Sequence, residues 1–125
     1  MALPAQARLQ AAQSFVRDVR ACGEFMREQD ALSAEGRYAR LLAELGQARE
    51  LLRWNPHAGR PARFLQARSF QGRALADRAQ SQARAVGLAG LRELVIKPYV
   101  LLYAHSDDRV VLLAFKHQRQ LSFRL

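Results

Sequence analysis

Hydrophobic residues recur at helical spacing over the first half of the 125-residue chain. They form two stripes, the first made of Ala12, Phe15, Val16, Val19, Cys22 and Met26 and the second of Tyr38, Leu41, Leu42, Leu45, Ala48 and Leu52. Steps of three and four residues place each set on one face of a helix. Asp30 or Ser33 can cap the second helix, and the residue before Pro56 ends it. The pattern therefore predicts an antiparallel helical hairpin over about residues 11–54.

The last third of the chain changes to a strand pattern, rich in β-branched, aromatic and aliphatic residues. Its three runs are Leu91–Ile96, Tyr99–His105 and Val110–His117. Ser and Asp side chains between the second and third runs favour a tight turn, and Pro98 fits a turn or a strand start because it has no amide proton. Ala7–Gln10 could add a short strand. We therefore expect an α+β fold, with the hairpin packed on a three- to four-stranded antiparallel sheet spanning about residues 91–123.

Both faces of this sheet are expected to be apolar. Alternation places Tyr99, Leu101 and Tyr103 on one side of the middle strand and Val100, Leu102 and Ala104 on the other. On the third strand, Val110, Leu112 and Ala114 oppose Val111, Leu113 and Phe115. The hairpin can cover one face, so the other is either packed by the rest of the chain or offered to a partner. In the second case Tyr99, Tyr103 and Phe115 are the expected apolar anchors, because aromatic residues concentrate binding energy.

Residues 62–90 combine many arginines with a weak helical signal. A narrow stripe of Leu75, Ala79, Ala83 and Val86 predicts a helix that buries little surface. We expect this helix to be mobile or ordered by a partner. Its arginines Arg73, Arg78 and Arg84 are candidate contacts for acidic groups of that partner.

The net charge of +9 is concentrated in the middle of the chain. Residues 1–50 carry seven arginines and seven acidic residues, whereas residues 51–92 carry eight arginines against Asp77 alone. Arginine suits planar contacts with phosphate or carboxylate, so the charge indicates a surface for nucleic acid or for an acidic protein. A general preference for arginine that serves only solubility is the alternative.

Length and composition predict a single domain over residues 1–125, located in the cytoplasm. The one cysteine, Cys22, excludes an intramolecular disulfide and falls on an apolar stripe, where it is expected to act as a small buried hydrophobe. No apolar run approaches the roughly 20 residues of a membrane span, and the N-terminus lacks the features of a signal peptide. No contact with a membrane is expected.

Few residues suggest chemistry. The sequence has no phosphate-binding glycine loop, no metal-spaced Cys/His cluster and no nucleophile elbow, so no cofactor or metal is expected. Reactive side chains are confined to the sheet, namely Arg92 and Glu93, Lys97, Tyr99 and Tyr103, and Lys116 to Arg119. If they converge, His117 could move protons while Arg92, Lys97 and Arg119 hold phosphates, which is enough to cleave RNA. The alternative is that residues 116–119 are the polar end of an edge strand.

Several of these pieces together resemble the RelE/ParE superfamily of bacterial toxins from type II toxin–antitoxin modules. They are the loop Pro56–Pro61 after a helical hairpin, the strand Leu91–Ile96, the run Tyr99–Tyr103, an acidic turn, Val110–Leu113 and Lys116–Gln120. The resemblance implies a compact toxin that inhibits growth and is neutralised by a cognate antitoxin in a hetero-oligomer. Measured against this pattern, the arginine-rich segment of about residues 62–90 looks like an insertion.

The superfamily contains two mechanisms. RelE-like members cleave mRNA on the ribosome with basic residues and a tyrosine or histidine near the C-terminus, and ParE-like members inhibit DNA gyrase. Val100 or Leu101 occupies the position of a RelE-like arginine, and Phe123 stands where a tyrosine could be. The Gly-Arg-Pro loop and the Leu-Arg-Glu-Leu strand are more similar to ParE, so the resemblance favours gyrase as the target. A RelE-type endoribonuclease and a non-toxic relative that only binds an antitoxin are the alternatives.

Overall fold

The computed structural model describes residues 6–120 and 122–125. Three α-helices, one short 3-10 helix and five strands follow in the order β1 Arg8–Ala11, α1 Gln13–Gln29, α2 Ala31–Trp54, β2 Arg60–Pro61, η1 Arg63–Gln66, α3 Phe70–Ala85, β3 Gly90–Ile96, β4 Tyr99–His105 and β5 Arg109–His117. Asp30 caps α2 by accepting a hydrogen bond from the Leu32 amide, and Ser69 caps α3 by accepting one from the Gly72 amide. The α+β class and the helical hairpin are confirmed.

The sheet has more strands than the sequence predicts. Strands β3, β4 and β5 form the expected antiparallel meander, and the full order is β1-β5-β4-β3-β2. β1 pairs with β5 in parallel, so the five-stranded sheet is mixed. β2 adds two residues to the far edge of β3, and one of them is Pro61, which cannot donate to a ladder. Such short edge strands carry no periodic signal and form only where a neighbour supplies the partner.

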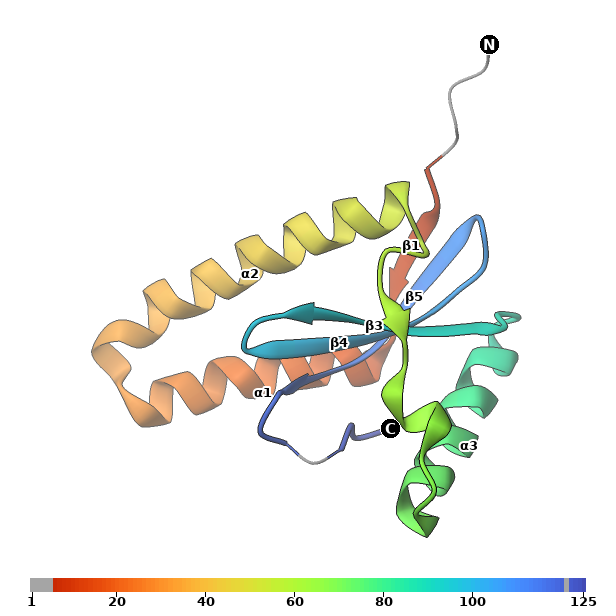
Figure 1. The fold of residues 1–125 in the computed structure, drawn as a ribbon. Helices are drawn as coiled ribbons and strands as arrows, with labels where there is room; N and C mark the ends of the chain where they lie inside the picture. Colours follow the sequence, from red (N-terminus) through yellow and green to blue (C-terminus); the bar gives the residue numbers. More distant parts are fainter. Residues whose placement is uncertain (1–5, 121) are drawn as a thin grey trace.

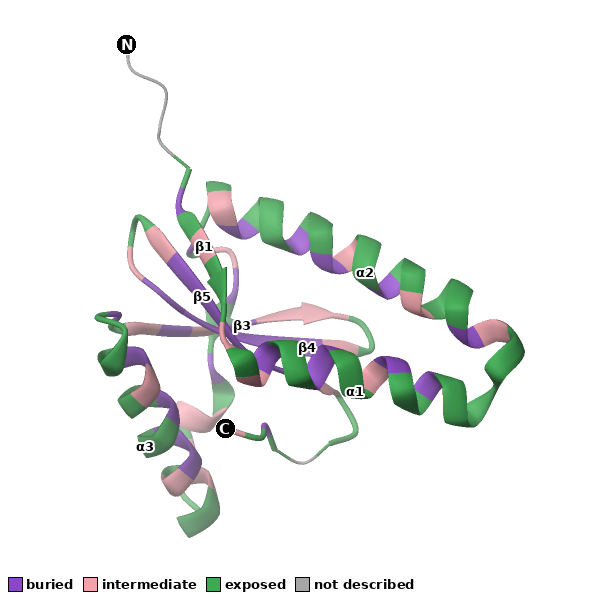
Figure 2. Cartoon of the chain, turned by 180° about the vertical axis from the view of Figure 1, so that it is seen from behind, coloured by how far each residue is buried: buried purple, intermediate pink, exposed green. Residues whose placement is uncertain are grey.

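Helices cover both faces of the sheet. Figure 1 shows the α1–α2 hairpin on one side of the strands and α3 on the other. The core on the hairpin side includes Phe15, Leu41, Leu101, Tyr103 and Phe115. The core on the α3 side includes Leu75, Ala79, Leu102, Leu113 and Phe123. The buried stripes of the helices turn toward the strands, and their outer faces are exposed (Figure 2).

A β-bulge changes which side chains of β5 share a face. The register shifts between Leu102 and Tyr103, which pair with Ala114 and Leu112, so Leu113 is the extra residue. As a result Ala114 joins the α3-side core and Phe115 joins the hairpin-side core. Simple alternation predicts the opposite faces for these two residues and is wrong after the bulge.

The second apolar face of the sheet is therefore not free for a partner. Leu75, Ala79 and Ala83 of α3 pack on it, and Ala79 has no exposed surface. The predicted anchors also lie on the other face, under the hairpin, where Tyr103 is 0% and Phe115 3% exposed and Tyr99 is half-buried. Tyr103 and Phe115 cannot touch a partner while the core is closed, which corrects the expectation that they anchor one.

Helix α1 covers the part of the β5 edge that β1 leaves open. β1 pairs with β5 only as far as Leu112. Beyond that point the Ser14 hydroxyl donates to the Leu113 carbonyl, and the buried Asp18 carboxylate accepts the Phe115 amide at 3.0 Å. These side chains satisfy backbone groups that an open edge would present to another chain.

Candidate functional site

A groove opens on the α3 side of the sheet, at the end where β5 leaves it. Its volume is about 390 Å³. η1 and α3 form one wall, the segment after β5 forms the other, and β3 to β5 supply the floor. It is lined by Arg60, Arg63, Phe64, Leu75, Glu93, Val100, Lys116, Gln118, Arg119, Gln120, Ser122 and Phe123.

One buried carboxylate organises the charges of this groove. Glu93 is 4% exposed and lies on β3 opposite Arg60 of β2. The Arg60 guanidinium donates to the Glu93 carboxylate at 2.7 Å, and the Arg63 guanidinium lies 4.0 Å from the same oxygen. Hydrogen-bonded pairing with arginine is what allows a carboxylate to be buried here. The pair also fixes β2 and the start of η1 to the sheet.

Lys116 is the second charged group on the floor. Its Nζ donates to the Gln120 carbonyl at 3.1 Å and lies 5.3 Å from the centre of the Phe123 ring. Burial lowers the pKa of Lys116, Glu93 raises it, and Arg63 and Arg60 lower it further. Lys116 therefore shares one electrostatic environment with Glu93, Arg60 and Arg63.

Tyr103 anchors the loop that leads into the groove. Its hydroxyl donates to the Pro56 carbonyl at 2.7 Å and accepts a hydrogen bond from the Gly59 amide at 2.9 Å. The Arg92 guanidinium donates to the Gly59 carbonyl at 2.8 Å. Burial raises the pKa of Tyr103, while the Gly59 hydrogen bond and the Arg92 charge lower it. Tyr103 is therefore a fixed neutral phenol that positions the 56–61 loop.

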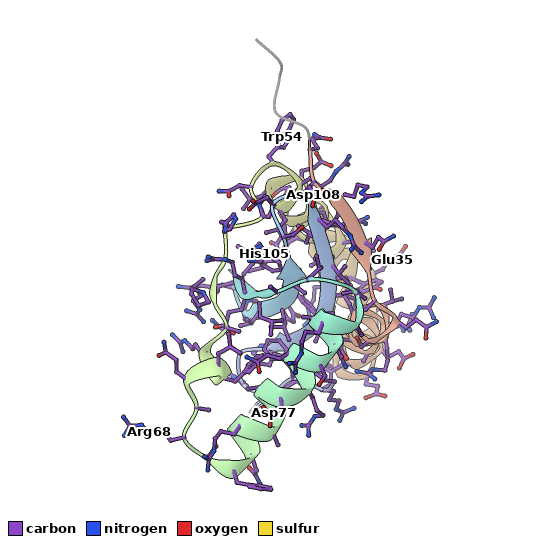
Figure 3. The ribbon with its side chains drawn as sticks, turned by 90° about the vertical axis from the view of Figure 1, so that its right-hand side faces the viewer. Glu35, Trp54, Arg68, Asp77, His105 and Asp108 are labelled. Carbon is purple, nitrogen blue, oxygen red and sulfur yellow. The ribbon has the colours of Figure 1, made fainter. Side chains whose placement is uncertain are left out.

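His105 extends this network to the β4–β5 turn. Its Nε2 accepts a hydrogen bond from Arg92 at 3.1 Å, and its ring lies edge-on to His57 with the centroids 4.7 Å apart. Burial lowers the pKa of His105 and is the largest influence on it; the Ser106 carbonyl and Asp107 oppose this shift, and His57 and Arg92 add to it. Figure 3 shows His105 between the sheet and the loop that follows α2. The sequence gives no sign of this role, because His105 packs against His57 of a loop that lies far from it along the chain.

The four residues predicted for RNA cleavage are not assembled. Arg92 pairs with Tyr103 in the sheet, whereas His117 pairs with Tyr99, four residues along β4. At about 3.3 Å per residue these positions differ by about 13 Å along the strand. Lys97 is exposed in the β3–β4 turn, and Arg119 lines the groove. His117 and Arg119 lie close together, where the Arg119 amide donates to His117 Nδ1 at 3.0 Å. The Gln118 amide donates to the Pro98 carbonyl at 2.8 Å, so the turn that holds Lys97 adjoins them and Arg92 is the residue that lies apart.

The arginines predicted to meet an acidic partner are all exposed, but they lie outside the groove. Arg73, Arg78 and Arg84 are on α3 and do not line it. Arg68 projects away from the ribbon before α3 (Figure 3). The groove uses Arg60 and Arg63 instead. Arg60 belongs to the Gly-Arg-Pro loop, and Arg63 is marked in the sequence only by the positive charge of residues 51–92. The local excess of arginine in residues 51–92 is therefore the sequence signal that indicates these two residues.

Other candidate chemistry is sparse. Cys22 is half-buried against the hairpin-side core, where burial and the nearby Asp18 raise the pKa of its thiol. In the described part of the chain, no three His, Cys, Asp or Glu side chains gather closely enough to hold a metal ion. Among the described helices, none combines the length and the apolar character that crossing a membrane requires.

Comparison with known proteins identifies relatives. Among solved structures, a chain described as the chromosomal ParDE TA system from P. aeruginosa is similar, with a TM-score of 0.57 and 13% sequence identity. The alignment covers 90% of this chain and 96% of that one, so the two share a fold. None of the curated proteins matches the sequence significantly. The family model described as ParE toxin of type II toxin-antitoxin system, parDE, matches residues 9–122. The chain therefore belongs to the ParE toxin family of type II toxin–antitoxin systems.

Proposed function

We propose that this chain, as a toxin of the ParE family, inhibits growth by acting on DNA gyrase and is neutralised by a cognate antitoxin. The resemblance to ParE-like members of the superfamily supports gyrase as the target. The observation that carries the choice between gyrase and mRNA is the separation of Arg92 from His117, about 13 Å along the sheet at about 3.3 Å per residue.

Cleavage of RNA needs a base, an acid and cationic groups that converge on one phosphate. Arg92 is held by the Gly59 carbonyl and by His105, and Lys97 lies in a turn. Phe123 is 5% exposed and has no proton to exchange. This arrangement supports a toxin that acts by binding a protein and not by hydrolysing RNA.

An open sheet edge supports the antitoxin as a partner. β3 pairs with β2 only at Arg92 and Glu93, so Leu94, Val95 and Ile96 have no strand on that side within the described residues. All three are half-buried. Free amide and carbonyl groups on an apolar edge are the usual basis for strand addition by a partner chain. Because α3 already covers the second face of the sheet, we place the antitoxin at this edge, as an added strand.

Controlled expression tests the proposed function. We expect expression of the chain to arrest growth, the purified protein to inhibit supercoiling by gyrase, and co-expression of the cognate antitoxin to restore growth. The variant His117→Ala should remain toxic, because His117 has no catalytic role in this proposal. Loss of toxicity in His117→Ala, together with mRNA cleavage by the unaltered protein, would establish the endoribonuclease instead. A chain that does not affect growth would be a relative that only binds its antitoxin.

A further inference from the structure

The groove on the α3 side has an excess of positive charge that the chain does not neutralise. Four cationic side chains, Arg60, Arg63, Lys116 and Arg119, line it together with a single carboxylate, Glu93. The Arg60 guanidinium forms an ion pair with that carboxylate at an N–O distance of 2.7 Å. Among the residues that the structure describes, neither Lys116 nor Arg119 forms an ion pair, and Arg63 is 77% exposed. A ligand with several negative charges would complement this surface.

Apolar side chains also line the groove, beside the charged groups of its floor. Leu75 of α3 and Val100 of β4 are buried there, and Phe64 of η1 contacts Phe123 edge to face with their ring centres 6.1 Å apart. A volume of about 390 Å³ accommodates a few side chains but no folded element. The ligand should therefore alternate aliphatic groups that reach the floor with acidic groups that meet the rim.

We propose that this groove binds an acidic, leucine- or valine-containing peptide segment of a partner protein. The proposal rests on the proposed function in one respect, because it takes the cognate antitoxin as the protein that carries this segment. Arg63 and Arg119, on opposite walls, hold its carboxylates, and the aliphatic side chains contact Leu75 and Val100 between them.

A single strand of nucleic acid fits the groove less well, although it also carries negative charge. Proteins that bind single strands stack bases on the faces of aromatic rings. Phe64 is half-buried, and its ring packs edge to face on the buried Phe123 with their centres 6.1 Å apart. The groove thus offers one half-buried ring and not the series of rings that successive bases stack on.

Titration of the purified full chain with a capped (Glu-Leu)4 peptide tests the groove, with a (Lys-Leu)4 peptide as the charge-reversed control. The double variant Arg63→Ser/Arg119→Ser removes two charges from the groove. The matched variant Arg78→Ser/Arg84→Ser removes two charges from exposed positions of α3 outside it. We expect the groove variant to weaken binding about tenfold and the matched variant to weaken it less than about twofold. Thermal unfolding should be similar for both, because all four side chains are exposed and Arg60 keeps its hydrogen bond to the buried Glu93.

Equal weakening by the two variants would overturn the proposal, because binding would then follow the overall charge and not the groove. Tighter binding of an eight-nucleotide oligouridylate than of the acidic peptide, lost in the groove variant, would also overturn it and assign the groove to nucleic acid. The readout does not depend on toxicity. If the chain fails to arrest growth but shows the expected pattern of peptide binding, the proposal that the groove binds an acidic peptide still holds. Only the identification of the partner as an antitoxin then fails.

Discussion

The Tyr103 hydroxyl lies 2.9 Å from the Gly59 amide nitrogen and accepts its hydrogen bond across 44 positions of sequence. Gly59 approaches so closely that a Cβ atom there would lie 2.8 Å from this hydroxyl and 2.6 Å from the Glu93 carbonyl. The contact joins the middle strand to the loop that precedes Arg60, and thus connects the core to the groove.

Tyr103→Phe should destabilise the protein. The substitution removes a buried hydroxyl and leaves the Gly59 amide and the Pro56 carbonyl without their partner. Each group left unsatisfied costs about 1–3 kcal/mol, so we expect the free energy of unfolding to fall by about 2 kcal/mol or more in urea denaturation. Tyr99→Phe on the same strand is the control, since it should cost less than about 1 kcal/mol. Equal losses in the two variants would contradict the role assigned to Tyr103.

Gly59→Ala and Gly46→Ala should change stability in opposite directions. The added methyl at position 59 meets backbone and the Tyr103 ring, so we expect a loss of about 1–3 kcal/mol. At position 46, within α2, a Cβ meets nothing within 4 Å. Alanine there should stabilise the helix by roughly 0.5–1 kcal/mol. Urea denaturation of both variants checks this, and a stabilising Gly59→Ala would show that the loop moves away freely.

Asp18→Ala should lower the free energy of unfolding because it removes the hydrogen bond to the edge of β5, and not because it removes the ion pair with Arg17. The buried carboxylate accepts the Phe115 amide at 3.0 Å and pairs with the half-exposed Arg17 at 3.2 Å. Its loss leaves a buried amide unsatisfied, at about 1–3 kcal/mol. Arg17→Ala removes only the exposed pair and should cost less than about 1 kcal/mol. If Arg17→Ala were as damaging as Asp18→Ala in thermal or urea unfolding, the ion pair would be the dominant interaction.

His105 should make stability depend on pH. Burial, His57 and Arg92 hold its pKa in the folded protein below the ordinary 6.5. Below about pH 6.5 the His105 side chain is therefore protonated more readily in the unfolded chain than in the folded one. The free energy of unfolding should fall as the pH drops below about 6.5, and the contribution of His105 should be fully present above that pH. His105→Gln keeps an acceptor for Arg92 without this proton and should show a shallower decline between about pH 6.5 and pH 5. Parallel curves of melting temperature against pH for the two proteins would contradict this prediction.

Local periodicity predicts much of this fold. The stripes containing Phe15 and Leu41 predict the hairpin, and the alternation of residues 99–105 predicts β4 at the observed bounds. The alanine stripe with Leu75 and Ala79 predicts α3, although not that it would cover the sheet. The candidate groove was not predicted, because Arg60, Glu93 and Lys116 come together only through pairing of β2, β3 and β5 with their neighbours.

The sequence by itself determined the α+β class, the hairpin, the meander and the positive charge of the middle segment, since these follow from neighbouring residues and their spacing. Only the tertiary structure decided the edge strand β2, the parallel pairing of β1 with β5, the bulge at Leu113 and the burial of Tyr103 and Phe115. The physical reason is that the hydrophobic effect is non-directional, so which element buries an apolar surface depends on what lies next to it in space and not on its neighbours in the sequence. Here α3 of the same chain covers the second face of the sheet, so we propose the open β3 edge and the groove as the surfaces for a partner.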